Sequence, residues 1–356
     1  MTALDRAAVA AVDPAGHAAD LLDLPTHLRD ALWRLESAAL QSVDAPGGLV
    51  VAGMGGSGVG GRLARSALWP QLRRPFELCP DYALAPWLGA DTVVLCASYS
   101  GGTEETLATF DDAGERGATR IVATSGGELE ARARREKVPV IPLPGGYQPR
   151  AAVGYAIVVA LEVAALAGVA PSIRGEVEGA AELAEQLIAE WGPDGPEDGE
   201  AKAIARRLDG SVPVIAGVEL TSAAAYRWKT QFNENAKLPA FAGELPELDH
   251  NEIVGWPAAP SLGRFAAVFL EDPNAGERNQ ARVALTEKLA TAAGAVSVER
   301  VRPRGEGRLA QLVSLVLLGD LVSLYLAVLR GEDPDDVAVL GRFKAELAEG
   351  ATAGDR

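Results

Sequence analysis

The chain has 356 residues, 48% of them hydrophobic, which is enough for about two globular domains with sizeable cores. Forty-nine acidic residues against 33 basic residues give a formal net charge of -16, which argues against nonspecific binding to nucleic acid or to an anionic membrane. The two cysteines lie in separate apolar runs, so the sequence indicates neither a disulfide framework nor a metal cluster, and a reducing cytoplasm is expected.

Two long apolar stretches, Ala151–Ala170 and Leu309–Leu329, have the length of membrane spans. Each carries an acid near its middle, Glu162 and Asp320, and such a group is costly inside a bilayer. We therefore expect buried or interface helices of a soluble protein. The first residues also lack the basic and then apolar pattern of a signal peptide.

The first part of the chain alternates strands and helices. Residues 1–24 are expected to be a loosely held lead-in, and an amphipathic helix then begins at Pro25 and ends near Leu40. Short apolar runs predict strands at 48–52, 76–80, 92–98, 121–124 and 138–143, and a helix closes the unit at 151–168. This alternation predicts a parallel sheet with helices on both faces.

A second unit follows a helical connector and a linker. The connector covers 175–190, and the Pro- and Gly-rich residues 191–200 are the clearest linker in the sequence. Apolar runs then predict strands at 212–218, 264–270 and 295–301, and helices at 222–235, 274–293, 309–330 and 337–349. Residues 239–249 are interpreted as a loop. We predict an α/β protein with one domain over 25–170, a connector over 171–204 and a second domain over 205–356.

Two turns in the first unit have the composition of an anion site. The glycine-rich residues Gly53–Gly61 follow a strand and open a helix, so their backbone N–H groups lie at the positive end of that helix. A second strand-to-helix turn carries four hydroxyls that suit the oxygens of a phosphate monoester: Ser98, Ser100, Thr103 and Thr106. A simple helix cap would explain one of these hydroxyls but not the group.

The same glycines allow a different interpretation. Residues Gly53–Gly58 fit the G-x-G-x-x-G pattern of dinucleotide-binding folds, and Asp81 could contact a ribose, so an NAD(P)-dependent oxidoreductase is an alternative. The hydroxyl-rich turn favours a phosphate monoester instead, because hydroxyls bind phosphate without Lys or Arg in an acidic protein.

The segment Gln231–Ile253 concentrates groups suited to proton transfer. A partly desolvated carboxylate such as Glu234 can take a proton from carbon, and a neutral imidazole such as His250 can exchange protons with a hydroxyl near pH 7. Helical spacing places Glu234 off the apolar stripe that contains Trp228 and Phe232. A solvated Glu and an ordinary loop His are the simpler interpretation of the two residues taken alone.

Five motifs in order resemble the bifunctional phosphoglucose/phosphomannose isomerases of the sugar isomerase (SIS) fold, over about residues 48–344. They are Gly53–Gly61, Ser98–Thr106, Gln148–Arg150, Asn233–Lys237 and Pro246–Ile253. The resemblance implies two tandem SIS domains, each a flavodoxin-like three-layer unit with a parallel sheet flanked by helices. It also implies a cytoplasmic homodimer that interconverts glucose 6-phosphate, mannose 6-phosphate and fructose 6-phosphate by ring opening and cis-enediol proton transfer, without cofactor or metal. A noncatalytic sugar-phosphate binder on this fold remains an alternative.

The resemblance further implies roles for single residues. Arg150 would face the enediolate, Glu234 would move the proton between C1 and C2, His250 of the partner subunit would open the ring, and Lys344 would assist. An enediolate needs a fixed positive group and a base of adjustable pKa, so these residue types suit the chemistry. The phosphate would be held by Gly55, Gly56, Ser57, Ser98, Ser100 and Thr103.

The sequence departs from the family at three places. Gly102 stands where the family usually has Asn, and Asp249 stands where an Asn usually precedes His250. A carboxylate beside His250 is expected to raise the pKa of the imidazole. Residues Asp333–Val337 also lack the Thr-Pro pair associated with mannose-type chemistry. We expect these departures to affect the balance of glucose and mannose activities rather than the class of reaction.

Overall fold

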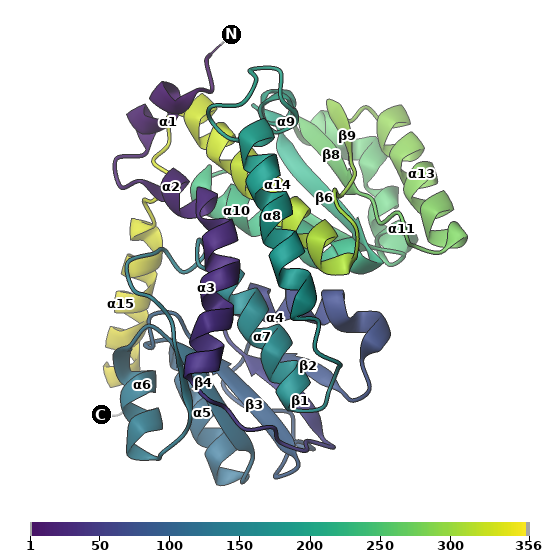
Figure 1. The fold of residues 1–356 in the computed structure, drawn as a ribbon. Coiled ribbons are helices and arrows are strands. Elements are labelled where there is room, and N and C mark those ends of the chain that lie inside the picture. Colours follow the sequence, from purple (N-terminus) through teal and green to yellow (C-terminus); the bar gives the residue numbers. More distant parts are fainter. Residues whose placement is uncertain (1, 354–356) are drawn as a thin grey trace.

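The first unit is built on a five-stranded sheet in which all neighbouring strands run parallel (Figure 1). The structure is a computed structural model and describes residues 2–353. The strand order is β2-β1-β3-β4-β5, with the bounds β1 (Gly48–Ala52), β2 (Phe76–Cys79), β3 (Thr92–Ala97), β4 (Thr119–Thr124) and β5 (Val140–Pro142).

Alternating side chains of this sheet are buried against helices on its two faces. Leu49, Val51 and Leu95 belong to the core that includes helices α4 and α7, whereas Val50 and Val94 belong to a separate core with helices α5 and α6. The result is a three-layer unit, as predicted. The helices of this unit are α3 (Leu24–Ser37), α4 (Gly55–Leu68), α5 (Glu104–Glu115), α6 (Gly127–Arg135) and α7 (Val153–Leu166), with a short 3-10 turn η1 (Trp69–Gln71).

The second unit has a four-stranded parallel sheet in the order β7-β6-β8-β9. Its strands are β6 (Val212–Val218), β7 (Phe241–Leu245), β8 (Phe265–Leu270) and β9 (Ser297–Val301). Its helices are α9 (Glu200–Leu208), α10 (Ser222–Asn235), α11 (Leu248–Asn251), α12 (Ala259–Leu262) and α13 (Glu277–Ala292), with 3-10 turns η2 (Glu219–Thr221), η3 (Glu252–Val254) and η4 (Trp256–Ala258). Two parallel sheets with flanking helices confirm the predicted α/β class.

The long apolar helix α14 (Arg308–Arg330) is the centre of the molecule. It packs against α4, α9, α10 and α8 (Gly175–Trp191), and its residues from Leu309 to Val328 are all buried. By length and composition it could cross a membrane, but 94% of its most apolar window is buried within the protein. The expectation of a buried helix is therefore confirmed for α14.

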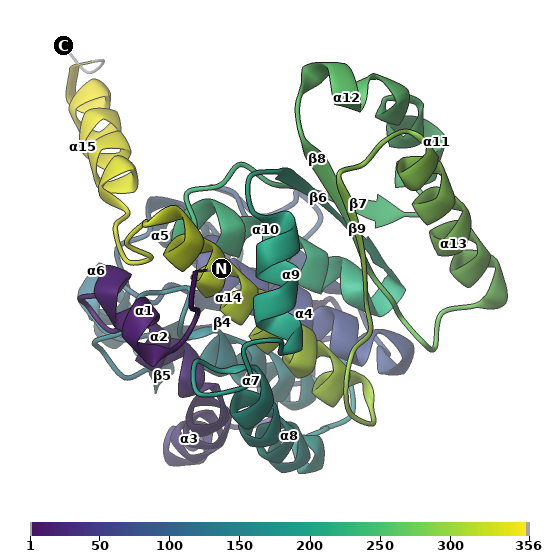
Figure 2. The same cartoon turned by 90° about the horizontal axis from the view of Figure 1, so that it is seen from above.

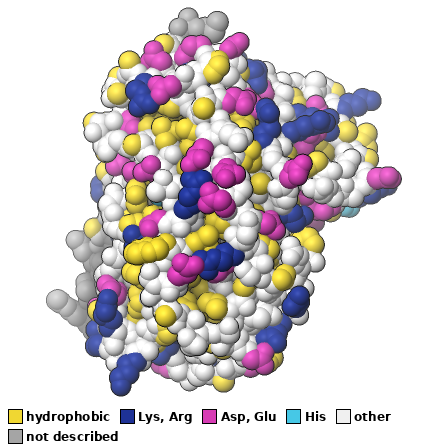
Figure 3. Space-filling view, viewed as in Figure 1, with side chains coloured by type: hydrophobic (Ala, Val, Ile, Leu, Met, Phe, Trp, Pro, Cys, Tyr) yellow, Lys and Arg dark blue, Asp and Glu magenta, His cyan; other side chains and the backbone are white. Residues whose placement is uncertain are grey.

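Helices α3 and α8 lie side by side on one face of the molecule (Figure 1). Arg29 of α3 forms ion pairs with Glu178 and Glu185 of α8, at 2.7 and 2.5 Å. Basic, acidic and apolar side chains are intermingled over this face (Figure 3). No field of a single sign covers this face.

Two sequence-based expectations about local structure are wrong. Residues 1–24 are not a loose lead-in, because α1 (Arg6–Val12) and α2 (His17–Leu22) pack on the body and bury Leu4 and Leu21. The predicted loop over 239–249 contains strand β7, whose Phe241 lies opposite Val214 of β6. β7 is an edge strand with a mostly exposed sequence, FAGEL, so it lacks the apolar run that identifies a buried strand.

The last helix, α15 (Ala338–Ala353), extends away from the two sheets (Figure 2). It follows the turn that ends α14. Apolar side chains on α15 are 47–67% exposed, namely those of Val339, Leu340, Phe343 and Leu347. An apolar stripe that is exposed to this extent is unusual for a helix of a monomeric protein.

Candidate functional site

The two phosphate-type turns of the sequence meet at one edge of the first sheet. β1 and β3 are neighbouring parallel strands, so their carboxyl ends lie together. The Ser57 hydroxyl accepts a hydrogen bond from the Tyr99 N–H at 3.2 Å, and the hydroxyls of Ser98 and Thr103 are 2.7 Å apart. The glycine-rich turn and the Ser98–Thr106 turn therefore approach each other.

Close backbone approach explains why this edge is rich in glycine. A Cβ on Gly56 would lie 2.5 Å from the carbonyl oxygen of Pro149 and 3.0 Å from the Cα of Arg150. Gly101 has a φ of +68°, and a Cβ there would lie 1.9 Å from the carbonyl oxygen of Gly126. The Gly56 contact places the glycine-rich turn directly against the residue that carries the candidate guanidinium.

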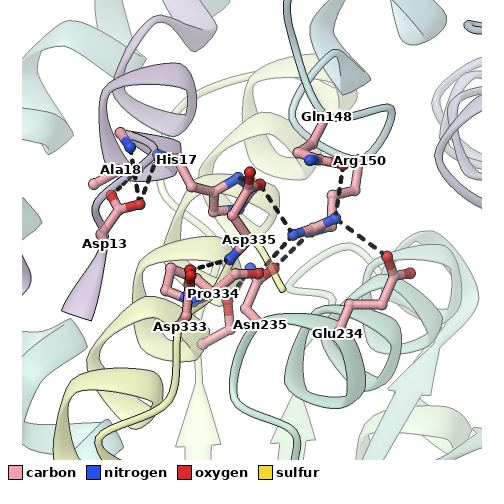
Figure 4. A network of polar contacts seen from close by, with 12 residues as sticks. Asp13, His17, Ala18, Gln148, Arg150, Glu234, Asn235, Asp333, Pro334 and Asp335 are labelled. Atoms are coloured by element: carbon pink, nitrogen blue, oxygen red, sulfur yellow. Dashed lines mark hydrogen bonds and ion pairs between the residues drawn. The ribbon is translucent and has the colours of Figure 1, made fainter. Parts of the chain in front are cut away.

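Arg150 is the centre of the polar network in Figure 4 and is only 4% exposed. Its Nε donates to the Asn235 Oδ1 at 2.7 Å, and its Nη2 donates to the Pro334 carbonyl at 2.6 Å. Its Nη1 lies 3.5 Å from the carboxylate of Glu234. Burial lowers the pKa of Arg150, while the neighbouring carboxylates oppose this change, and a guanidinium stays charged at neutral pH.

A second buried arginine, Arg227, contacts the backbone of Arg150. Arg227 pairs with Asp320 at 2.6 Å, and both side chains are almost completely buried. The Arg227 Nη2 also donates to the Arg150 carbonyl at 3.0 Å. Asn235 is held in turn by Ser323 of α14 at 2.9 Å. These contacts fix the backbone and the side chain of Arg150 to helices α10 and α14, so the guanidinium has a preset position.

Glu234 lies in the last turn of α10, and its side chain is 31% exposed. Nearby, the Lys237 ammonium donates to the Glu234 carbonyl at 2.8 Å and also to the carbonyl of Asp333. The Glu234 carboxylate is thus partly shielded from solvent and lies next to the fixed Arg150 guanidinium. It remains open to a ligand, as a general base requires.

An N-terminal histidine also reaches the network. His17 is 1% exposed, and its Nδ1 lies 3.8 Å from the Asp335 Oδ1, which is itself 3.7 Å from the Arg150 Nη2 (Figure 4). Neither ring nitrogen of His17 has a hydrogen-bond partner among the described residues. Asp13 caps the helix that carries His17 by accepting from the Ala18 N–H at 2.7 Å.

Two of the expected site residues lie elsewhere in the chain's own fold. His250 is on α11, its side chain is 64% exposed, and it contacts neither Arg150 nor Glu234 in the described part of the chain. The Asp249 Oδ1 lies 4.0 Å from the His250 Nε2 but only 2.5 Å from the Arg282 Nη1. The Asp249 carboxylate therefore pairs with Arg282 more closely than with His250. Lys344 is exposed on α15.

Sequence reasoning assigned no role to several residues of this network. Asn235 and Lys237 lie in the Asn233–Lys237 motif, and Asp320 is a lone acid in an apolar helix, so the sequence could have indicated a role for these three residues. His17 and Asp335 carried none, because only the fold brings residues 17, 150 and 335 together. Ser100 is exposed, and its hydroxyl accepts weakly from the Gly102 N–H at 3.4 Å.

Comparisons with known proteins agree with this geometry. Residues 197–347 match the family model of the bacterial phospho-glucose isomerase C-terminal SIS domain. The chain is 38% identical over 305 residues to a bifunctional phosphoglucose/phosphomannose isomerase of Caldicellulosiruptor bescii, covering 85% of this chain and 89% of the relative. It is 37% identical over 307 residues to the enzyme of the same name from Aquifex aeolicus, covering 85% and 91%.

The fold is also found in solved structures. A glucose-6-phosphate isomerase like protein from Thermus thermophilus superimposes with a TM-score of 0.65 and 20% identity, over 96% of this chain and 99% of that one. With identities above 30% over most of two curated relatives, the conclusion is that the chain belongs to the bifunctional phosphoglucose/phosphomannose isomerase family.

Proposed function

We propose that the protein is a cytoplasmic isomerase that interconverts glucose 6-phosphate, mannose 6-phosphate and fructose 6-phosphate. The observation that carries this proposal is the placement of Glu234 and Arg150, 3.5 Å apart, directly beside the glycine- and hydroxyl-rich turns. An anion site, a fixed cation and a partly shielded base thus lie in one continuous region, which an aldose–ketose isomerase needs.

The phosphate occupies the edge of the first sheet. Its oxygens accept hydrogen bonds from the backbone N–H groups of Gly55 and Gly56 and from the hydroxyl group of Ser57 at the start of α4. The hydroxyls of Ser98, Ser100 and Thr103 complete the set. Binding at this end fixes the sugar, so that its C1 and C2 atoms lie at the Arg150 side of the glycine-rich turn.

The proton moves by way of Glu234. Its carboxylate removes the proton from C2 of the open-chain aldose, or from C1 of the ketose, and returns it to the other carbon, while the hydroxyl proton passes between O2 and O1. The enediolate that forms between these steps carries negative charge on oxygen, and the Arg150 guanidinium stabilises that charge. Because Arg150 is held by Asn235 and Pro334, it needs no reorganisation at the moment of reaction.

Ring opening is assigned to His250 of a second subunit. The exposed imidazole can exchange a proton with the ring oxygen of the sugar, but it does not reach the candidate site of its own chain. Exposed apolar side chains on the segment 241–262, which includes His250, support a subunit contact: Phe241, Val254 and Leu262 are 57–78% exposed. We propose a homodimer in which His250 crosses to the partner and α15 carries Lys344 toward a site.

The proposal is tested by assaying the purified protein with the three hexose 6-phosphates, with and without a chelator. All three should interconvert in both conditions. Glu234→Gln should lower kcat by about 100-fold or more, since loss of a general base removes about 10²–10⁴ of rate, while sugar-phosphate binding stays within a few-fold. The matched control is Glu115→Gln, which alters an exposed carboxylate at the C-terminal end of α5, away from this site. Sugar-phosphate binding without turnover in the wild type would favour the noncatalytic alternative.

A further inference from the structure

A second polar cavity lies at the far end of the helices that carry the candidate active site. It has a volume of about 350 Å³ and is lined by side chains from both units, including Arg62, Arg65 and Trp69 from the first and Ser222 and Arg308 from the second. α10 begins here at Ser222 and carries Glu234 in its last turn, so the 14-residue helix separates the two places by about 20 Å. A ligand in this cavity is therefore not the sugar that reacts at Glu234 of the same chain.

Three arginines that line the cavity have contacts other than ion pairs. The Arg62 guanidinium lies 4.6 Å from the centre of the Tyr226 ring, and that of Arg65 lies 5.2 Å from the centre of the Trp69 ring. The Arg308 Nη2 donates to the Ser66 carbonyl at 2.9 Å. None of the three forms an ion pair with a carboxylate in residues 2–347. In a chain of net charge -16, three unpaired cations around one cavity form a local positive site.

Further donors belong to residues that line the same space. The Nε of Arg65 and the hydroxyl of Ser222 are buried and have no hydrogen-bond partner among the described residues. The N-terminal ends of α10 and α14 border the cavity with Ser222 and Arg308, and these ends carry partial positive charge. Buried donors without an acceptor are rare in folded proteins, so they point to an acceptor supplied by a ligand.

Two carboxylates lie among the lining residues. Glu219 is exposed and accepts a hydrogen bond from the Asn279 side chain at 2.8 Å, and Glu244 is exposed on β7. Carboxylates accept hydrogen bonds from hydroxyl groups but repel a phosphate. A ligand with a phosphate at one end and hydroxyls at the other satisfies both kinds of group.

We infer that this cavity is a second binding site for a small phosphorylated polyol. The phosphate binds Arg62, Arg65 and Arg308 at the ends of α10 and α14, and the hydroxyls of the ligand bind the carboxylates. The inference does not depend on the isomerase assignment, because it rests on charges and donors that the proposed reaction does not use.

The test counts glycerol 3-phosphate sites per chain by equilibrium dialysis. The wild type should bind two, Arg62→Gln/Arg65→Gln one, Ser98→Ala/Thr103→Ala one, and the four-fold variant none. Arg264→Gln is the matched control, because it removes an exposed arginine at the opposite edge of the second sheet, and it should bind two. Thermal melting of each variant establishes that it is folded.

A single site in the wild type that persists in Arg62→Gln/Arg65→Gln, or two sites in Arg62→Gln/Arg65→Gln, would overturn the inference. If the Gln variants do not fold, Arg62→Lys/Arg65→Lys keeps the charge and loses the planar donors, and it should weaken the second site about 10-fold. If Arg62→Lys/Arg65→Lys bound at the second site with unchanged affinity, the inference would also be overturned. A variant that keeps both sites but dissociates on sedimentation would identify the arginines as a subunit contact instead.

Discussion

At the scale of single residues, burial and neighbouring charge set what each titratable group of the network can do. Arg150 is held by partners on two segments, α10 and the turn after α14, and Glu234 is left partly open beside it. His17 lies on the other side of Asp335 from Arg150. Burial, followed by the charge of Arg150, lowers the pKa of His17 to about 3, so this imidazole is neutral in the folded protein.

This burial makes the free energy of unfolding depend on pH. The unfolded chain protonates His17 at its ordinary pKa of 6.5, whereas the folded chain does not until about pH 3. Stability is therefore fully present above pH 6.5 and is lost as pH falls between these values, by up to about 1.4 kcal/mol per pH unit. His17→Gln should reduce the dependence of the free energy of unfolding on pH, as measured by urea unfolding at pH 7.5, 5.5 and 4.5. His250→Gln, which alters an exposed imidazole, is the control, and equal slopes for wild type and His17→Gln would refute the account.

At the scale of elements, strand order and helix ends decide where the chemistry lies. The adjacency of β1 and β3 brings together two turns that are about 45 residues apart, and α10 delivers Glu234 beside Arg150. Apolar runs and glycine-rich turns predicted most of this. The edge strand β7 has no such run, and the packing of α1 and α2 depends on surface supplied by distant parts of the chain, so neither could be predicted.

Gly56→Ala tests the contact between two of these elements. The new Cβ would lie 2.5 Å from the Pro149 carbonyl, so the glycine-rich turn must move away from Arg150. A displacement of about 1 Å at a site of this kind costs on the order of 100-fold in kcat/KM. Gly89→Ala is the matched control, since a Cβ at that position would have no other atom within 4 Å, and it should retain near-normal kcat/KM. Equal kcat/KM values for Gly56→Ala and Gly89→Ala would mean that the glycine-rich turn does not position the site.

At the scale of the whole molecule, the site of one chain lacks the imidazole that the proposed ring opening needs. Sequence resemblance placed His250 and Lys344 in the site, and the fold of the single chain leaves both exposed outside it. A second subunit can cover the exposed apolar stripe of α15 and the exposed apolar side chains of residues 241–262. No pattern within one sequence specifies such a contact, because it depends on how two folded surfaces fit.

Mixed dimers test the crossing of His250. Glu234→Gln and His250→Ala chains, each nearly inactive alone, should regain activity when they are co-expressed and the tagged heterodimers are isolated. One of the two sites in such a dimer would contain an intact Glu234 and an intact His250, so about half of the wild-type rate per dimer is expected if the sites act independently. Heterodimers that stay inactive would mean that each site is contained in one chain.

The central claim is that Glu234 moves a proton between C1 and C2 through an enediolate. Fructose 6-phosphate should therefore be converted in D₂O, and the deuterium content at C2 of the aldose products should be measured by NMR spectroscopy. A carboxylate that accepts the proton can exchange it with solvent, so the wild type should place deuterium at C2, and Glu234→Gln should form labelled product at least about 100-fold more slowly. Conversion by the wild type without any deuterium at C2, or labelled product from Glu234→Gln at a near-normal rate, would contradict the assignment.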